Sequence, residues 1–234
     1  MTLIGIDFCQ LCDEEIPFSE IFKGQLIFQN RIVCEKCMRQ FKTFKQLCCS
    51  DCGGKVAKAQ RTCLECLTWQ KYLGFRTNNI AVFMYNEIMQ NYLTRYKFQG
   101  GYHLSKLFRR AIWHKIYQQK AEIVVPIPVH EITYQQRGYN QVEGILGTNF
   151  TRLLTKAIFA EPQSKKTKLE RLDTSNPFRI DSQVSVSLET KICLVDDVYT
   201  TGRTLRHAYN TLRQVGFTQL NSVTLARSGF MREV

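Results

Sequence analysis

The stretch that decides the fold reads Ile192-Cys193-Leu194-Val195-Asp196-Asp197-Val198-Tyr199-Thr200-Thr201-Gly202-Arg203-Thr204. Its four leading apolar residues are typical of a buried strand of a parallel sheet. Two carboxylates follow the strand, and a turn of threonines and glycine then opens a helix. Such a turn can direct main-chain amides and hydroxyls at a phosphate, with the positive end of the helix dipole behind them. Because the carboxylates can accept hydrogen bonds from the hydroxyls of an attached sugar, the stretch predicts a sugar 5-phosphate site.

Strands and helices alternate around this stretch from residue 71 onward. We expect strands at 79–85, 122–127, 191–195 and 222–226, and helices at 86–98, 103–117, 141–159 and 203–215. This alternation predicts an α/β fold, in which helices cover both faces of a mostly parallel sheet. Ligands of such folds bind beyond the carboxyl ends of the strands, where the threonine turn is expected.

The first 70 residues are rich in cysteine and hold nine of the ten cysteines in the chain. Eight of them form the Cys-x-x-Cys pairs Cys9 and Cys12, Cys34 and Cys37, Cys49 and Cys52, and Cys63 and Cys66. Tetrahedral zinc needs four thiolates at about 2.3 Å, and two such turns supply them. We therefore predict a small zinc-ribbon-like module at residues 1–70, followed by a sheet domain at residues 71–234.

The number of zinc ions and the pairing of the four turns stay open in the sequence. Sequential pairing gives one ion to the first two turns and a second ion to the last two, whereas a cross-braced arrangement joins the first with the third and the second with the fourth. A single ion with spare cysteines is an alternative, because Cys48 can replace Cys49. Disulfides are a weaker alternative, since no secretory segment precedes the cysteines and a reducing compartment is expected.

The charge of the chain is unevenly distributed. Lys and Arg number 32 against 20 Asp and Glu, a formal net charge of +12. Residues 1–70 hold 9 basic and 8 acidic side chains, whereas residues 71–234 hold 23 basic and 12 acidic ones. The sheet domain is therefore expected to attract nucleic acid or phosphorylated ligands. No apolar run approaches the roughly 18 residues of a membrane span, so we expect a cytoplasmic protein, with peripheral membrane association left open.

The stretch from Ile192 to Thr204 resembles the phosphoribosyl pyrophosphate motif of type I phosphoribosyltransferases. The resemblance implies the sheet of that family, catalytic Asp196 and Asp197 that hold the ribose hydroxyls, and magnesium that bridges ribose and pyrophosphate. It implies that the turn holds the 5-phosphate, with Tyr199 and Arg203 contributing mainly backbone contacts. The residues that it assigns to the ligand are Asp196, Asp197, Val198, Tyr199, Thr200, Thr201, Gly202, Arg203 and Thr204.

Further segments narrow the resemblance. They are Val125-Pro126-Ile127-Pro128, Arg137-Gly138-Tyr139-Asn140-Gln141 and Tyr96-Lys97-Phe98-Gln99-Gly100-Gly101. Together with the cysteine-rich start, they are similar to ComF-type competence proteins over nearly the whole chain. This similarity implies a role in natural transformation on the cytoplasmic side, where the protein handles incoming single-stranded DNA together with a helicase-like ATPase.

Two segments are candidates for contacts with nucleic acid. Arg137, Tyr139 and Asn140 offer a guanidinium, an aromatic face and an amide, a set suited to stacking a base and holding a phosphate. The plainer interpretation is a solvated loop whose tyrosine packs on the sheet. A basic run of Lys165, Lys166 and Lys168 is most often solvated surface, yet it can also follow a phosphate backbone.

Two functions remain. In the first, the chain handles single-stranded DNA and binds phosphoribosyl pyrophosphate, or a similar sugar phosphate, as a ligand. In the second, it is an active transferase that moves the phosphoribosyl group to a nitrogen acceptor while magnesium assists the departure of pyrophosphate. We favour the first function, because no segment reads as an acceptor pocket and the charge of the sheet domain exceeds what one small ligand needs.

Overall fold

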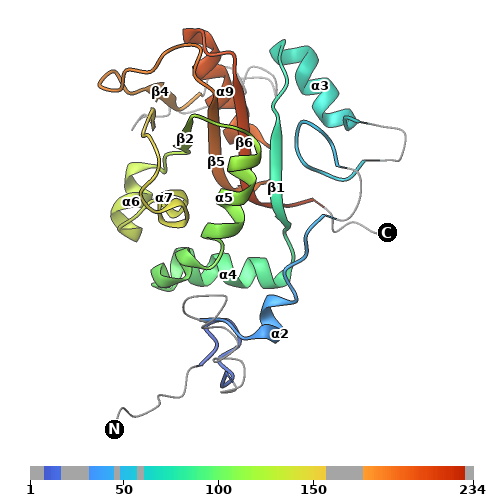
Figure 1. The fold of residues 1–234 in the computed structure, drawn as a ribbon, viewed down its shortest axis with the longest axis vertical. Coiled ribbons are helices and arrows are strands. Elements are labelled where there is room, and N and C mark those ends of the chain that lie inside the picture. Colours follow the sequence, from blue (N-terminus) through green and yellow to red (C-terminus); the bar gives the residue numbers. More distant parts are fainter. Residues whose placement is uncertain (1–7, 17–31, 45–47, 57–60, 157–175, 230–234) are drawn as a thin grey trace, which may run out of the picture.

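The computed structural model describes residues 8–16, 32–44, 48–56, 61–156 and 176–229. Its centre is a four-stranded sheet in the order β1-β6-β5-β2, in which every neighbouring pair is parallel. The strands are β1 (Asn79–Met84), β2 (Ile123–Pro126), β5 (Ile192–Tyr199) and β6 (Leu220–Arg227). Since β5 lies inside the sheet between β6 and β2, its apolar run is buried (Figure 1).

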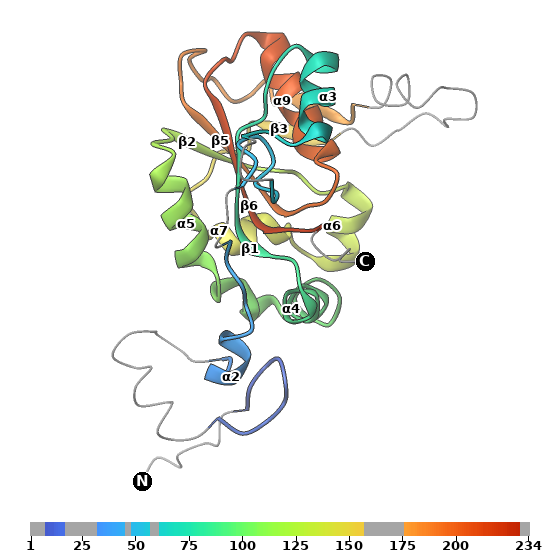
Figure 2. The same ribbon diagram turned by 90° about the vertical axis from the view of Figure 1, so that its right-hand side faces the viewer.

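Helices cover both faces of this sheet (Figures 1 and 2). On one face, Cys193 and Val195 of β5 share a core with α4 (Glu87–Phe98), α5 (Arg109–Gln118) and α7 (Gln141–Leu146). On the other face, Ile192 and Leu194 share a core with α9 (Arg203–Val215). The alternation follows from the two-residue period of a strand. The predicted α/β class with helices on both faces is confirmed.

Shorter elements complete the described chain. They are α2 (Glu35–Met38), α3 (Leu64–Leu73), the 3-10 helix η1 (Tyr102–Lys106), α6 (Glu131–Arg137), and the antiparallel strands β3 (Leu154–Lys156) and β4 (Phe178–Ile180). Both views show α2 below α4, while α3 lies beside α9 (Figure 2). Every helix in these ranges is too short or too polar to cross a bilayer.

The helix expected at 141–159 is wrong in its second half. α7 ends at Leu146, because Gly147 has a φ of +88°. A Cβ at Gly147 would also lie 3.0 Å from Cζ of Arg109. Leu153 and Leu154 are instead buried in the core beside α9. Their apolar character therefore reflects burial and not a continuing helix.

Two further elements differ from the expectation in their bounds. The helix expected at 103–117 is interrupted, since η1 ends at Lys106 and α5 begins at Arg109. The strand expected at 191–195 is too short, because β5 pairs with β6 as far as Tyr199 and Arg227. Asp196 and Asp197 consequently lie within a strand and not after it.

The cysteine-rich segment bonds to the sheet domain at several places, two of which are ion pairs. Asp13 forms an ion pair of 2.7 Å with Arg95 of α4. Asp51 accepts a hydrogen bond of 2.6 Å from Arg76, and its carbonyl accepts one of 3.1 Å from the amide of Asn79. The boundary between residues 1–70 and 71–234 stays a prediction, and these polar contacts cross it.

Candidate functional site

The candidate site is the turn between β5 and α9. Gly202, at the N-cap of α9, has a φ of +73°. The side chain of Tyr199 is buried beneath the turn, and a Cβ at Gly202 would lie only 2.1 Å from its hydroxyl oxygen. Only glycine therefore fits both the backbone conformation and the contact with the ring.

Two buried arginines hold the carbonyls of this turn. Arg227, 8% exposed, donates to the carbonyl of Thr200 at 2.9 Å. Arg206, 4% exposed, donates to the carbonyl of Thr201. Among the described residues, the amides of Thr200, Thr201 and Thr204 have no hydrogen-bond partner, and the three side chains are exposed. Amides of this kind at the start of a helix form a site for an anion.

The acidic pair lies in the strand that leads into the turn. Asp196 and Asp197 are 8% and 7% exposed. Asp197 forms an ion pair with Lys97, which lies in the last turn of α4. Burial first, and then the charge of Asp197, raise the pKa of Asp196 to about 8. Burial therefore favours the protonated form of Asp196, in which the pair offers one hydrogen-bond donor beside acceptor oxygens.

The structure thus brings together the predicted acidic pair and the predicted turn. Three residues that complete the site were not predicted, namely Lys97, Arg206 and Arg227. Lys97 lies in the segment Tyr96–Gly101, which contributed to the family resemblance. Its position in the sequence does not indicate that it pairs with Asp197. Arg227 comes from a strand that is adjacent only in the folded sheet, so no local pattern could reveal it.

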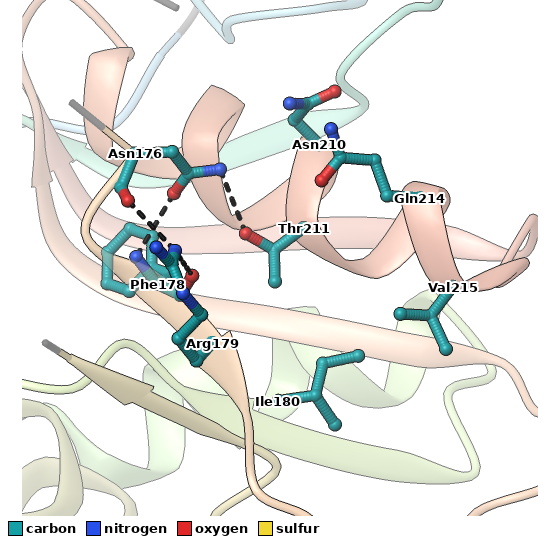
Figure 3. Close-up of a pocket in the computed structure, with 8 residues that line it drawn as sticks. All are labelled: Asn176, Phe178, Arg179, Ile180, Asn210, Thr211, Gln214 and Val215. Atoms are coloured by element: carbon teal, nitrogen blue, oxygen red, sulfur yellow. Dashed lines mark hydrogen bonds between the residues drawn. The ribbon is translucent and has the colours of Figure 1, made fainter. Parts of the chain in front are cut away.

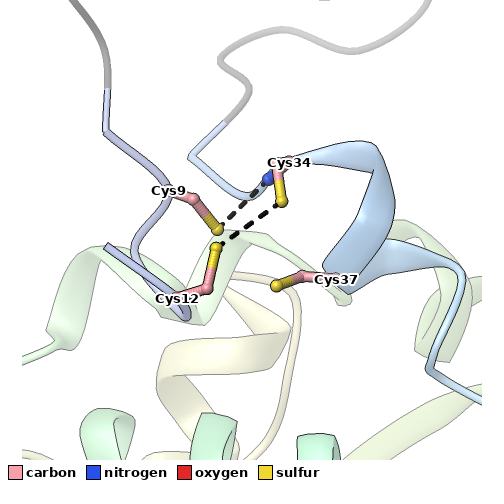
Figure 4. Close-up of side chains that lie close together, drawn as sticks. All are labelled: Cys9, Cys12, Cys34 and Cys37. Atoms are coloured by element: carbon pink, nitrogen blue, oxygen red, sulfur yellow. Dashed lines mark hydrogen bonds between the residues drawn. The ribbon is translucent and has the colours of Figure 1, made fainter. Parts of the chain in front are cut away.

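The eight paired cysteines form two groups of four, and the sulfurs of each group lie within 4.8 Å of one another. The first cysteine group contains Cys9, Cys12, Cys34 and Cys37 (Figure 4), and the second contains Cys49, Cys52, Cys63 and Cys66. Sequential pairing is confirmed, and the cross-braced arrangement is wrong. Cys48 belongs to neither group, so it does not replace Cys49.

Both cysteine groups have the dimensions of a zinc site. A tetrahedron with zinc–sulfur bonds of about 2.3 Å has neighbouring sulfurs about 3.8 Å apart. The distance between the sulfurs of Cys12 and Cys34 is 3.8 Å, and that between Cys52 and Cys63 is 3.9 Å. Main-chain amides also point at the sulfurs, as in the 3.4 Å contact from Gly54 to Cys52. The donor set therefore fits a structural zinc ion in each group.

The segment Arg137–Asn140 packs against the end of α4. Arg137 donates to the carbonyl of Lys97 at 3.1 Å, and the ring of Tyr139 lies 5.5 Å from that of Tyr96. Asn140 is buried, and it caps α7 through a 2.8 Å bond from the amide of Val142. These bonds support the segment that carries Lys97, while the nucleic-acid role stays a prediction. Lys165, Lys166 and Lys168 lie outside the described residues.

Comparison with known proteins finds three relatives that are similar over most of the chain. Competence protein ComFC of Streptococcus pneumoniae (strain ATCC BAA-255 / R6) is 31% identical over 224 residues, which span 94% of this chain and 99% of the relative. Competence protein ComFC of Bacillus subtilis (strain 168) is 29% identical, spanning 94% and 95%. Competence protein F of Haemophilus influenzae (strain ATCC 51907 / DSM 11121 / KW20 / Rd) is 24% identical, spanning 88% and 95%. No family model matches the chain.

Native mass spectrometry tests the two cysteine groups. We expect two zinc ions in the wild-type protein. Cys34→Ser/Cys37→Ser and Cys63→Ser/Cys66→Ser should each retain one ion, because each variant removes half of one ligand set. Cys193→Ser is the control and should retain both, since this buried cysteine lies in β5 outside either group. A wild-type protein with a single ion contradicts this assignment.

Proposed function

The chain belongs to the family of ComFC competence proteins, and we propose that it handles single-stranded DNA in natural transformation and binds phosphoribosyl pyrophosphate or a similar sugar phosphate. Membership rests on relatives that match most of the chain and are named competence proteins. The observation that carries the ligand proposal is the Thr200–Thr204 turn, whose carbonyls are bonded to Arg206 and Arg227 and whose amides are left for an anion.

The 5-phosphate of the ligand would lie over this turn. The exposed hydroxyls of Thr200, Thr201 and Thr204 add donors to those of the main chain. α9 is 13 residues long, so its dipole places partial positive charge at the same point. Because Gly202 has no side chain, the phosphate can approach the main chain closely.

The ribose would lie beside Asp196 and Asp197. A protonated carboxyl next to an ionised one can donate to one hydroxyl and accept from its neighbour. Magnesium prefers oxygen ligands, which Asp197 and the oxygens of the ligand offer, and when bound it would offset the charge of the pyrophosphate. Lys97, which forms an ion pair with Asp197, would add a positive charge beside the ribose.

The excess of basic residues in the sheet domain supports the nucleic-acid part of the proposal. Residues 71–234 hold 23 basic and 12 acidic side chains. A strand of DNA contacts several cations at once, whereas one pyrophosphorylated sugar needs few. We place this activity on the cytoplasmic side of the membrane, together with a helicase-like ATPase and two structural zinc ions.

Phosphoribosyl transfer is the second candidate function, and the pKa of Asp196 favours it. A carboxyl group with a pKa of about 8 is suited to exchanging a proton near neutral pH beside the ribose. Release of pyrophosphate from phosphoribosyl pyrophosphate in the presence of a panel of bases would identify this function, and Asp197→Asn should abolish it. Binding without turnover leaves the ligand role.

Calorimetry with phosphoribosyl pyrophosphate and magnesium tests the turn. The wild-type protein should bind the ligand, and Gly202→Ala should weaken binding by at least about 10-fold, because a Cβ there strains the turn and displaces Tyr199. Gly74→Ala is the matched control. Gly74, which ends α3, has a φ of +72°, but a Cβ there meets nothing within 4 Å, so this variant carries the backbone strain without the contact. Equal binding by both variants contradicts the proposed site.

Titration of labelled oligothymidylate at several salt concentrations tests the nucleic-acid role. A protein that contacts about five phosphates of a single strand should lose roughly 100-fold in affinity between about 50 and 200 mM salt. The measurement is fluorescence anisotropy. Absence of binding at low salt, or an affinity that does not depend on salt, would remove the DNA part of the proposal while leaving the ligand part untouched.

A further inference from the structure

The outer face of α9 carries a stripe of basic and amide side chains. Arg203, His207, Asn210 and Gln214 are spaced three or four residues apart, so they share one face of the helix. The helix sequence contains three arginines and no acidic residue. Arg203 and Gln214 are exposed, Asn210 is half-buried, and His207 is buried. The stripe begins at the threonine turn and follows α9 to its C-terminal end.

α3 supplies an aromatic wall beside the start of this stripe. The rings of Trp69 and Tyr72 meet edge to face at 6.1 Å. The guanidinium of Arg206 lies 4.4 Å from the ring of Trp69, which fixes the orientation of that ring. Tyr72 remains 40% exposed. An aromatic surface is therefore held in place next to cationic side chains.

The other end of the stripe lines a cavity of about 440 Å³ between α9 and β4, within the roughly 300–1,000 Å³ range of ligand pockets. Figure 3 shows the amides of Asn210 and Gln214 at its rim. The side-chain amide of Asn176 donates to the hydroxyl of Thr211 at 3.0 Å, which connects the two sides of this cavity. A second cavity of about 20 Å³ next to Trp69 shares Asn176 and Asn210 with the first, so the two adjoin, and we call the surface over both of them the groove.

We propose that this groove between α3, α9 and β4 binds single-stranded DNA. Aromatic rings stack unpaired bases, arginines contact phosphates, and carboxamides bond to base edges. No Asp or Glu of the described chain lines either cavity, so a phosphate backbone meets no repulsion there. A duplex would keep its bases stacked on one another and could not use Tyr72 in this way. The inference rests on the proposed function and names the surface that performs it.

Anisotropy with oligothymidylate tests the aromatic wall. Tyr72→Ala should weaken binding by about 5- to 100-fold, the effect of losing one stacked base. Tyr117→Ala is the matched control, because Tyr117 is 70% exposed and also adjoins a tryptophan, Trp113, but on the opposite face of the sheet. Its affinity should equal that of the wild-type protein.

A second variant tests the amide end of the groove. Asn210→Ala/Gln214→Ala changes only partly or fully exposed side chains and should weaken binding by about 2- to 10-fold. If the wild-type protein binds DNA and both Tyr72→Ala and this double variant bind equally well, the groove is wrong although the DNA role stands. If the wild-type protein binds no DNA, both the role and the groove fail.

Different contacts carry a second inference, about the two arginines beneath the turn. Arg206, which donates to the carbonyl of Thr201, also lies 3.7 Å from the sulfur of Cys66. Arg227, which donates to the carbonyl of Thr200, also lies 4.0 Å from the sulfur of Cys52. Each guanidinium therefore connects the second cysteine group with the turn.

We infer that Arg206 and Arg227 are positioning residues through which metal in the second cysteine group orders the phosphate-binding turn. Four thiolates around a zinc ion carry a net charge of about −2, which stabilises two buried cations beside them. Without the ion nothing holds the four sulfurs together, and the two guanidinium groups lose the fixed sulfurs that they contact. The first cysteine group contacts α4 and not the turn, so its ion should have no such effect. This inference also rests on the proposed function.

Matched variants separate the two cysteine groups. Cys63→Ser/Cys66→Ser should weaken the binding of phosphoribosyl pyrophosphate by at least about 10-fold and speed amide hydrogen exchange over residues 199–204, whereas Cys34→Ser/Cys37→Ser should change neither. Arg206→Lys, which keeps the charge but loses the second donor arm, should also speed the exchange. Hydrogen exchange is measured without the ligand, so it tests this inference even if the ligand proposal fails. Exchange over residues 199–204 that is unchanged both in Cys63→Ser/Cys66→Ser and in Arg206→Lys would overturn the inference.

Discussion

Two neighbouring carboxylates inside the buried central strand are the constraint on which the rest of the structure depends. Placing a charge in a protein interior costs on the order of several kcal/mol unless a partner compensates it. Burial favours the protonated, neutral form of Asp196, and the ion pair with Lys97 offsets the charge of Asp197. The preceding residues of the strand, Ile192–Val195, are buried in the same interior and are all apolar. An acidic pair that is buried at a cost in free energy, at the end of a strand and beside a glycine turn, indicates a functional site.

The surroundings of the pair are organised around this constraint. Lys97 reaches Asp197 because α4 ends beside the sheet, and Arg137 bonds to the carbonyl of Lys97. At the end of the strand, the ring of Tyr199 fills the space under Gly202, and Arg206 and Arg227 donate to the carbonyls of the turn. The second cysteine group also contacts both of those arginines, through Cys66 and Cys52. The second cysteine group, the buried charge pair and the turn between β5 and α9 thus form one continuous set of contacts.

Local patterns predicted the parts of the structure that local chemistry determines. The helix at 203–215 has the predicted bounds, because glycines with positive φ stand at both of its ends. The spacing of the cysteines likewise predicted all eight members of the two cysteine groups. The helix at 141–159 was overextended, because the periodicity of Leu153 and Leu154 is the same whether they lie on a helix or against a sheet. Lys97 and Arg227 were missed since their partners are remote in sequence, and the groove along α9 arises only when α3 packs against it.

A crystal structure with phosphoribosyl pyrophosphate and magnesium tests the central claim most directly. The account predicts that a phosphate of the ligand lies within hydrogen-bonding distance of the amides of Thr200, Thr201 and Thr204, and that the ribose hydroxyls contact Asp196 and Asp197. A ligand held elsewhere on the chain, with the acidic pair still closed on Lys97 and the turn empty, would contradict it.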